Sequence, residues 1–112
     1  MRMNEAYEQE VERTYGGVES LEETLAVAAL GLAGEVGEVA DIVKKWLFHE
    51  HPLDVLHLAD ELGDVLWYVT LAATAIGYSL DNIMERNVEK LRRRYPDGFD
   101  VARSLNRSEF EG

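Results

Sequence analysis

The chain contains no cysteine and only two prolines, and acidic residues outnumber basic ones by 22 to 11. The absence of thiols excludes a disulfide scaffold, a thiolate zinc site and cysteine-based catalysis. The net charge of −11 argues against nucleic-acid binding, because such binding depends on neutralising phosphates with Lys and Arg. A chain of 112 residues is too short for two ordinary cores, so we expect one domain over residues 1–112.

Long hydrophobic runs are missing as well. The longest stretch without a charged residue, Val65–Leu80, includes Thr, Ser and Tyr. It is shorter than the roughly 20 residues that a bilayer span needs. The start of the chain, MRMNEAYEQEVERTY, is polar and acidic, unlike a secretory signal. We therefore expect a soluble, cytoplasmic protein with no membrane partner.

Helical periodicity and its breakers predict four helices and no strands. Ser20 and Glu23 have the spacing of a capping box, which marks the start of the second helix. Pro52 disfavours helix in the residue before it and so separates the second helix from the third. Ser79 is a suitable N-cap for the fourth. The predicted fold is all-α, a bundle of four main helices at about residues 4–14, 20–47, 53–76 and 79–94, with irregular chain from Phe99.

The third predicted helix has no polar stripe after Asp64, since its sequence there is VLWYVTLAATAIGY. A helix that is apolar all round must be covered on every side. A monomer of four helices leaves one side open, so we expect a second copy of the chain to complete the bundle. Trp67 and Tyr68 are expected to lie in the core of the protein rather than beside a bound base.

Two acidic pairs with the same spacing interrupt the apolar second and third helices. They are Glu35-x-x-Glu38 and Glu61-x-x-Asp64. Residues three apart share one helix face, so each pair projects two carboxylates in one direction. Two solvated helix faces would be the plain alternative, but uncompensated charge is costly among apolar neighbours. Four converging carboxylates predict a hard divalent cation, Mg²⁺ or Mn²⁺, and phosphate chemistry.

Glycines and basic residues add two weaker signals. Gly31, Gly34 and Gly37 recur three apart in the second helix, where they allow close approach of a neighbouring helix or leave room for a metal-bound phosphate. We favour close packing as the main reason. The fourth helix carries a basic cluster that either holds a small anion or complements the helix C-terminus: Arg86, Lys90, Arg92, Arg93 and Arg94.

The histidines provide little support for a softer metal. A di-iron bundle would need Glu-x-x-His on two helices, and the chain offers only Asp54 and His57 at that spacing, in one copy. His49 and His51 are expected at the surface rather than as metal ligands, with either one able to reach a bound phosphate. Lys44 and Lys45 are either surface charges or a phosphate clamp, and the sequence does not distinguish the two.

The segments GLAGEVGEVADIVKK, ADELGDVLWYV and NVEKLRRRYPDGF, in this order, resemble the MazG-like all-α nucleoside triphosphate pyrophosphohydrolases. The resemblance covers roughly residues 20–107. It implies a helical bundle that assembles as a homodimer or homotetramer. It also implies Mg²⁺-dependent cleavage between the α- and β-phosphates of a nucleoside triphosphate, which releases a monophosphate and pyrophosphate. Deoxynucleotides or non-standard nucleotides are the expected substrates, in nucleotide-pool house-cleaning.

The resemblance also implies roles for individual residues. The metal ligands would be Glu35, Glu38, Glu61 and Asp64, with Glu35 and Glu38 also catalytic. The substrate contacts would come from the fourth helix and the residue after it: Asn87, Lys90, Arg93, Arg94 and Tyr95.

One departure from the family pattern leaves part of the chemistry open. Many members carry E-E-x-x-E, and here Gly34 stands in place of the first Glu. The number of metal ions and the carboxylate that activates water therefore stay undecided. A catalytically silent helical interaction module and a structural metal-binding bundle are the two competing interpretations.

Overall fold

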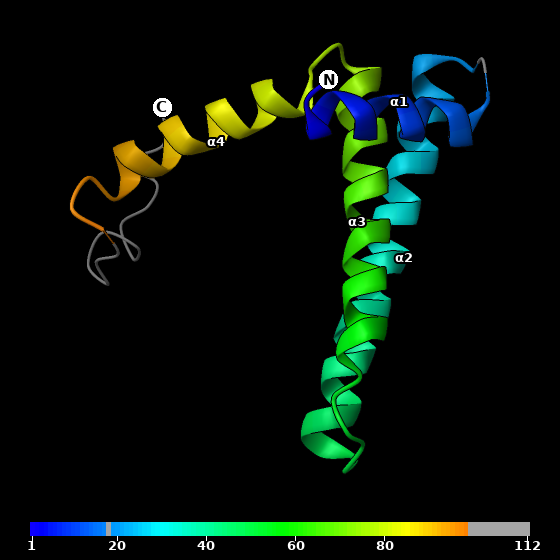
Figure 1. Cartoon of the computed structure of the whole chain (residues 1–112), viewed down its shortest axis with the longest axis vertical. Helices are drawn as coiled ribbons and strands as arrows, with labels where there is room; N and C mark the ends of the chain where they lie inside the picture. Colours follow the sequence, from blue (N-terminus) through cyan, green and yellow to red (C-terminus); the bar gives the residue numbers. More distant parts are fainter. Residues whose placement is uncertain (18, 99–112) are drawn as a thin grey trace. The chain divides into compact units, whose positions relative to one another are not determined.

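The computed structural model describes residues 1–17 and 19–98, which form four helices (Figure 1). No strand occurs within these two ranges, so the predicted all-α fold class is confirmed. None of the helices in them has the length and apolar character needed to cross a membrane. The irregular tail expected from Phe99 lies outside the described residues. The helices are α1 (Met3–Tyr15), α2 (Leu21–Phe48), α3 (Val55–Ala75) and α4 (Leu80–Arg94).

The chain divides into two compact units, Met1–Ser79 and a second that begins at Leu80. The first unit holds α1, α2 and α3, and the second begins with α4. The single domain over residues 1–112 therefore stays a prediction, as does completion of the bundle by a second chain.

Local hydrogen bonds explain where α2 and α3 begin. Ser20 caps α2 as predicted, because its Oγ accepts from the backbone N–H of Glu23 at 3.1 Å. The Ser20 hydroxyl in turn donates to the Glu23 carboxylate at 3.0 Å. Asp54 caps α3, accepting from the backbone N–H of His57 at 3.0 Å, so this helix begins about two residues later than predicted. These side chains satisfy backbone donors that a helix leaves unpaired at its N-terminus.

The two long helices form an antiparallel hairpin and lie side by side (Figure 1). They are tightly packed at Gly31, where an added Cβ would overlap the ring of Tyr68. The Tyr68 ring meets Trp67 edge-on, with ring centroids 5.0 Å apart. As expected, both aromatic residues contribute to packing within the protein.

Helix α1 packs across the hairpin and contacts α3. The Tyr7 hydroxyl donates to the Gly63 carbonyl at 3.2 Å, and Trp67 Nε1 donates to Thr14 Oγ1 at 2.8 Å. The small buried core where the three helices meet comprises Val11, Ala28 and Leu71. Both hydrogen bonds anchor α1 to α3 near the acidic positions of that helix.

A large apolar surface stays uncovered in the single chain. Leu30 of α2 and Leu56 of α3 are 75% and 79% exposed. Such exposure is costly, since buried apolar area contributes about 25 cal/mol per Å². Exposed apolar side chains also flank the loop between α2 and α3: Trp46, Leu47, Phe48 and Val55.

Candidate metal centre

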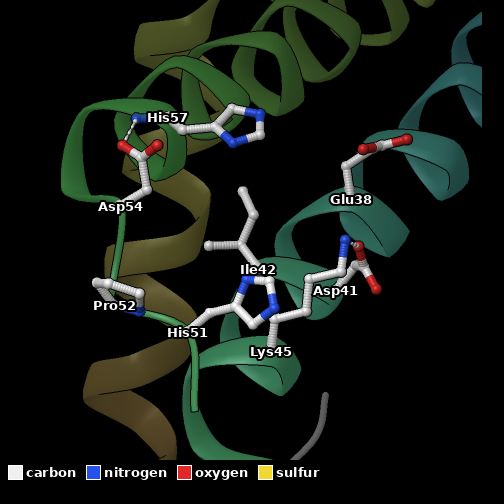
Figure 2. Close-up of a pocket in the computed structure, with 8 residues that line it drawn as sticks. All are labelled: Glu38, Asp41, Ile42, Lys45, His51, Pro52, Asp54 and His57. Atoms are coloured by element: carbon white, nitrogen blue, oxygen red, sulfur yellow. Dashed lines mark hydrogen bonds and ion pairs between the residues drawn. The ribbon is translucent and has the colours of Figure 1, made fainter. Parts of the chain in front are cut away.

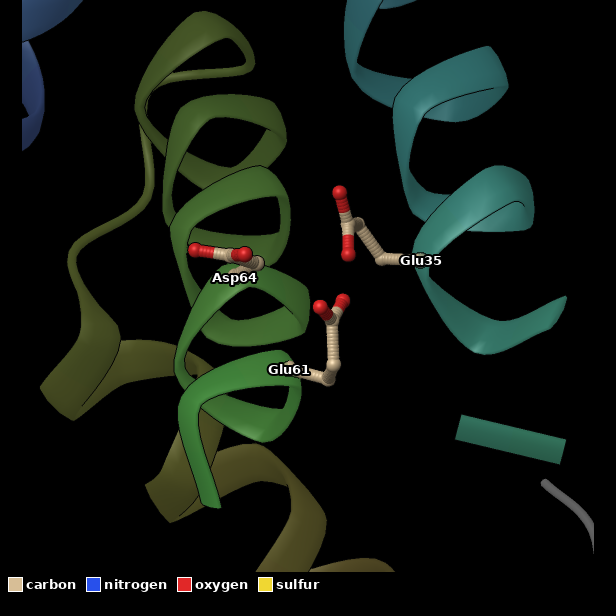
Figure 3. A group of neighbouring side chains, drawn as sticks. All are labelled: Glu35, Glu61 and Asp64. Carbon is tan, nitrogen blue, oxygen red and sulfur yellow. The ribbon is translucent and has the colours of Figure 1, made fainter. Parts of the chain in front are cut away.

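Three carboxylates from the two long helices meet in the middle of the hairpin. Glu35 of α2 faces Glu61 of α3, and Asp64 follows one turn further along α3 (Figure 3). Each residue offers an oxygen within 4.8 Å of the other two. The antiparallel hairpin brings the predicted positions together because Glu61 and Asp64 share one face of α3.

Glu35 is the most perturbed member of this cluster. Its Oε2 atom is buried and has no hydrogen-bond partner. The pKa of Glu35 rises from 4.5 to about 7, first through a hydrogen bond with Glu61, then through burial, then through the negative charges of Glu61, Asp64 and Glu38. The contact with Glu61 is a hydrogen bond only when one carboxyl carries a proton. When both are ionised, Glu35 Oε2 has no donor.

These observations fit a divalent cation. Mg²⁺ and Mn²⁺ prefer carboxylate oxygens, and the cluster supplies three such ligands without nitrogen or sulfur. A cation between Glu35 and Glu61 would replace the shared proton and offset the repulsion that raises the pKa of Glu35. The donor set and the unpartnered oxygen therefore match the metal that the sequence predicts.

Neighbouring residues hold the α3 carboxylates. His57 Nε2 lies 3.3 Å from Oε1 of Glu61, one turn back along the same helix. Tyr7 of α1 lies close to Asp64, since the pKa of Tyr7 is raised by burial and then by the charge of Asp64. The Asp54 carboxylate accepts a hydrogen bond from the backbone N–H of His57. The spacing of these two residues therefore belongs to the N-cap of α3 rather than to a metal-binding motif.

The fourth predicted ligand, Glu38, is exposed and does not join the three-carboxylate group. It lies one turn along α2 from Glu35 and lines a cavity of about 530 Å³ at the loop end of the hairpin (Figure 2). A cavity of this size is large enough for part of a nucleotide. The other residues that line it are Asp41, Ile42, Lys45, His51, Pro52, Asp54 and His57.

Lys45 lines the cavity and forms an ion pair with another lining residue, Asp41. Its Nζ lies 2.9 Å from Asp41 Oδ2, one turn back along α2. The hydrogen bond from Lys45 lowers the pKa of Asp41, with further contributions from the charges of Lys45, Lys44 and His49. The structure therefore places Lys45, but not Lys44, in the wall of the cavity.

One glycine of the stripe along α2 has a packing role. Gly31 allows the close approach of Tyr68, as the packing interpretation expects. A Cβ at Gly34 or Gly37 would meet no described atom within 4 Å. Room for a metal-bound phosphate at these two positions stays a prediction.

The predicted substrate contacts lie on α4 and directly after it. Asn87 and Lys90 are exposed and share one face of the helix. Arg93 is also exposed, whereas Arg94 and Tyr95 are half-buried. Because these residues belong to the second unit, their approach to the carboxylates stays a prediction.

Sequence reasoning missed the contact between His57 and Glu61. His57 was considered only as the partner of Asp54 in a metal motif. The i, i+4 spacing of His57 and Glu61 places them one above the other on a helix and could have revealed the contact. The place of Asp41 in the cavity wall was also missed, since the cavity depends on how the α2–α3 loop folds back.

The all-α hairpin gathers three carboxylates from both of its helices in an arrangement that could hold a divalent cation. The chain belongs to the MazG nucleotide pyrophosphohydrolase domain family, whose sequence model matches residues 23–99. The chain is 38% identical over 80 residues to the "Gene 37 protein" of Mycobacterium phage L5, an alignment that covers 68% of this chain and 70% of the phage protein. No solved structure matched the chain.

Proposed function

We propose that this protein hydrolyses nucleoside triphosphates to a nucleoside monophosphate and pyrophosphate with Mg²⁺ as the cofactor. The family match supports nucleotide pyrophosphohydrolase chemistry. The observation that carries the proposal is the convergence of Glu35, Glu61 and Asp64 within 4.8 Å, with a buried oxygen of Glu35 left unpartnered.

Glu35, Glu61 and Asp64 would hold the cation, and Glu38 would complete the set. Since Glu38 is exposed, its side chain can turn toward a cation held one helical turn away. The charge of Glu38 already contributes to the raised pKa of Glu35, which places the two carboxylates within electrostatic reach. Mn²⁺ would serve as a substitute, because it accepts the same oxygen ligands.

The cation would neutralise phosphate oxygens and favour departure of a charged leaving group. Glu35 or Glu38 would accept a proton from the attacking water. The water oxygen forms a bond to the α-phosphorus, the bond from that phosphorus to the bridging oxygen breaks, and pyrophosphate leaves.

Substrate contacts would come from α4. Lys90 and Asn87 on one face, with Arg93, Arg94 and Tyr95 following, would bind the triphosphate and stabilise pyrophosphate as it forms. Deoxynucleoside or non-standard nucleoside triphosphates are the proposed substrates, in nucleotide-pool house-cleaning in the cytoplasm.

A homodimer or homotetramer would cover the exposed apolar surface. Besides Leu30 and Leu56 on the hairpin, α4 exposes Met84, Val88 and Leu91 at helical spacing. An apolar stripe of this kind is typical of a helix that packs against another element. A second copy would supply part of that cover.

The test is a screen of natural and modified nucleoside triphosphates with Mg²⁺ or Mn²⁺ and separate detection of pyrophosphate and phosphate. We expect monophosphate and pyrophosphate in equal amounts from at least one substrate. Sequential phosphate release through a diphosphate would contradict the mechanism. A protein that bound Mg²⁺ without turnover would instead be a structural metal-binding bundle, and one that did neither would be a silent interaction module.

A further inference from the structure

We infer that His57 is a positioning residue, which holds the Glu61 carboxylate in place for the cation. The inference rests on the proposed function, since it assumes that Glu61 is a metal ligand. His57 itself is outside the predicted ligand set, and its contact with Glu61 is visible only in the folded helix.

The geometry begins at the N-terminus of α3. Asp54 Oδ1 accepts from the backbone N–H of His57 at 3.0 Å and so fixes the first turn of the helix. His57 Nε2 then lies 3.3 Å from Glu61 Oε1 across the next turn. Nε2 can donate to the carboxylate in the neutral tautomer that carries its proton there, and in the protonated ring.

Glu61 is a carboxylate with little access to water, so a donor within the protein matters for its position. Its side chain is only 16% exposed, whereas that of His57 is 52% exposed. Water has little access to Glu61, and Glu61 faces Glu35, whose charge repels it when both are ionised (Figure 3). Without the imidazole, Glu61 would turn away from Glu35 toward solvent. His57 thus keeps the two carboxylates facing each other at the position that a cation would occupy.

His57 acts through Glu61 rather than as a ligand. Among the described residues, the group whose ligand atoms approach within 4.8 Å contains Glu35, Glu61 and Asp64 but no histidine. Mg²⁺ also prefers oxygen over nitrogen. Residues that orient a metal ligand in this way typically change metal affinity or activity by about 10–100-fold when they are replaced.

His57 also lines the cavity at the loop end of the hairpin, on the same wall as Asp54 (Figure 2). Its Nε2 atom lies 3.3 Å from Glu61 Oε1. The same imidazole therefore lines the cavity and contacts a proposed metal ligand.

The test compares His57→Phe, which keeps a flat ring but removes the donor, with His57→Gln, which restores an N–H at similar reach. Mn²⁺ affinity is measured directly, from the electron paramagnetic resonance signal of free Mn²⁺. We expect His57→Phe to bind Mn²⁺ about 10–100-fold more weakly than wild type and His57→Gln to recover most of the loss. The matched control is His49→Phe, at an exposed histidine outside the cavity, which should bind Mn²⁺ like wild type.

Kinetics separates positioning from a general structural role. Raising the Mg²⁺ concentration should restore kcat in His57→Phe, because the defect lies in cation binding, while the metal-free melting temperature stays near that of wild type. Equal Mn²⁺ affinity in wild type and His57→Phe would overturn the inference and leave the proposed function intact. An equal loss in His57→Gln and His57→Phe would overturn the hydrogen-bond assignment. A wild type that binds no divalent cation would refute the proposed function itself, and this inference with it.

Discussion

The ring of Tyr68 in α3 occupies the space that a side chain at Gly31 in α2 would need. An added methyl group would overlap three atoms of the ring, so the two long helices can approach this closely only with glycine at that position. The contact sets the spacing of the hairpin one turn before Glu35, and so affects how close the carboxylates of α2 and α3 come.

Gly31→Ala should therefore lower stability, by about 1–3 kcal/mol, because overpacking forces the ring or the helix to move. Gly34→Ala is the matched control, at a position with no described atom near an added Cβ. It should raise stability by about 0.5–1 kcal/mol, as alanine is the better helix former. Urea unfolding measures both. A stabilising Gly31→Ala would contradict the close packing.

Stability of the metal-free protein should depend on pH through Glu35. Its pKa in the folded state is about 7 against an ordinary 4.5, so the folded state binds a proton that the unfolded state has released between these values. Stability should fall as pH rises from about 4.5 to about 7 and then level off. Asp41 and Glu10 have the opposite effect on stability, and at lower pH. Hydrogen bonds from Lys45 and Arg13 lower their pKa values, so their contribution to stability is lost as pH falls.

Glu35→Gln is the direct check of that pH dependence. It keeps the shape of the side chain and removes the titrating group, so the decline between pH 4.5 and 7 should shrink relative to wild type. Chemical unfolding at several pH values in the presence of a chelator provides the measurement. An identical pH profile in the two proteins would show that Glu35 is not the group responsible.

Asp64→Asn should gain less stability from the cation than wild type does, so the order of their melting temperatures should depend on Mg²⁺. In metal-free buffer above pH 7 the variant should melt at or above the wild-type temperature, because one repelling charge has gone. With saturating Mg²⁺ the order should reverse, since only the intact site gains stability by binding a cation to the folded state.

Thermal melting with and without Mg²⁺ measures this reversal, and Glu38→Gln tests the fourth carboxylate in the same way. Glu22→Gln, at an exposed position in the first turn of α2, should show neither effect. If Mg²⁺ stabilised wild type and both site variants equally, these carboxylates would not be the ligands.

Lys90→Ala and Asn87→Ala should impair turnover more than folding. Loss of a charged contact to phosphate costs on the order of 1.5–3 kcal/mol, which lowers kcat/KM by about 10–150-fold for Lys90→Ala. Arg92→Ala is the matched control, because Arg92 is exposed on another face of the same helix. Wild-type kcat/KM in either variant would remove that residue from the proposed substrate contacts.

Light scattering at micromolar concentration should report a multiple of the 12.7 kDa chain mass. Leu30→Glu should shift the protein toward the monomer, because it places a charge in the exposed apolar surface of α2. A wild type that stays monomeric would mean that the surface is covered from within the chain.

The secondary structure and the chemical type of the site follow from local sequence. Ser20 and Glu23 cap α2 as their spacing predicts, and four helices form near the predicted boundaries. Helix periodicity and capping depend on residues within a few positions of one another, so the sequence alone determines them. The proposal of a hard divalent cation also rests on the sequence, because the acidic pairs offer only oxygen ligands.

The tertiary structure decided how the acidic positions differ from one another. By sequence Glu35 and Glu38 are equivalent, yet Glu35 joins Glu61 and Asp64 while Glu38 faces a cavity. That difference depends on the distance between α2 and α3, which the contact of Gly31 with Tyr68 sets across a long separation in sequence. The raised pKa of Glu35 has the same origin, since burial and the charge of Glu61 arise only when the two helices pack together.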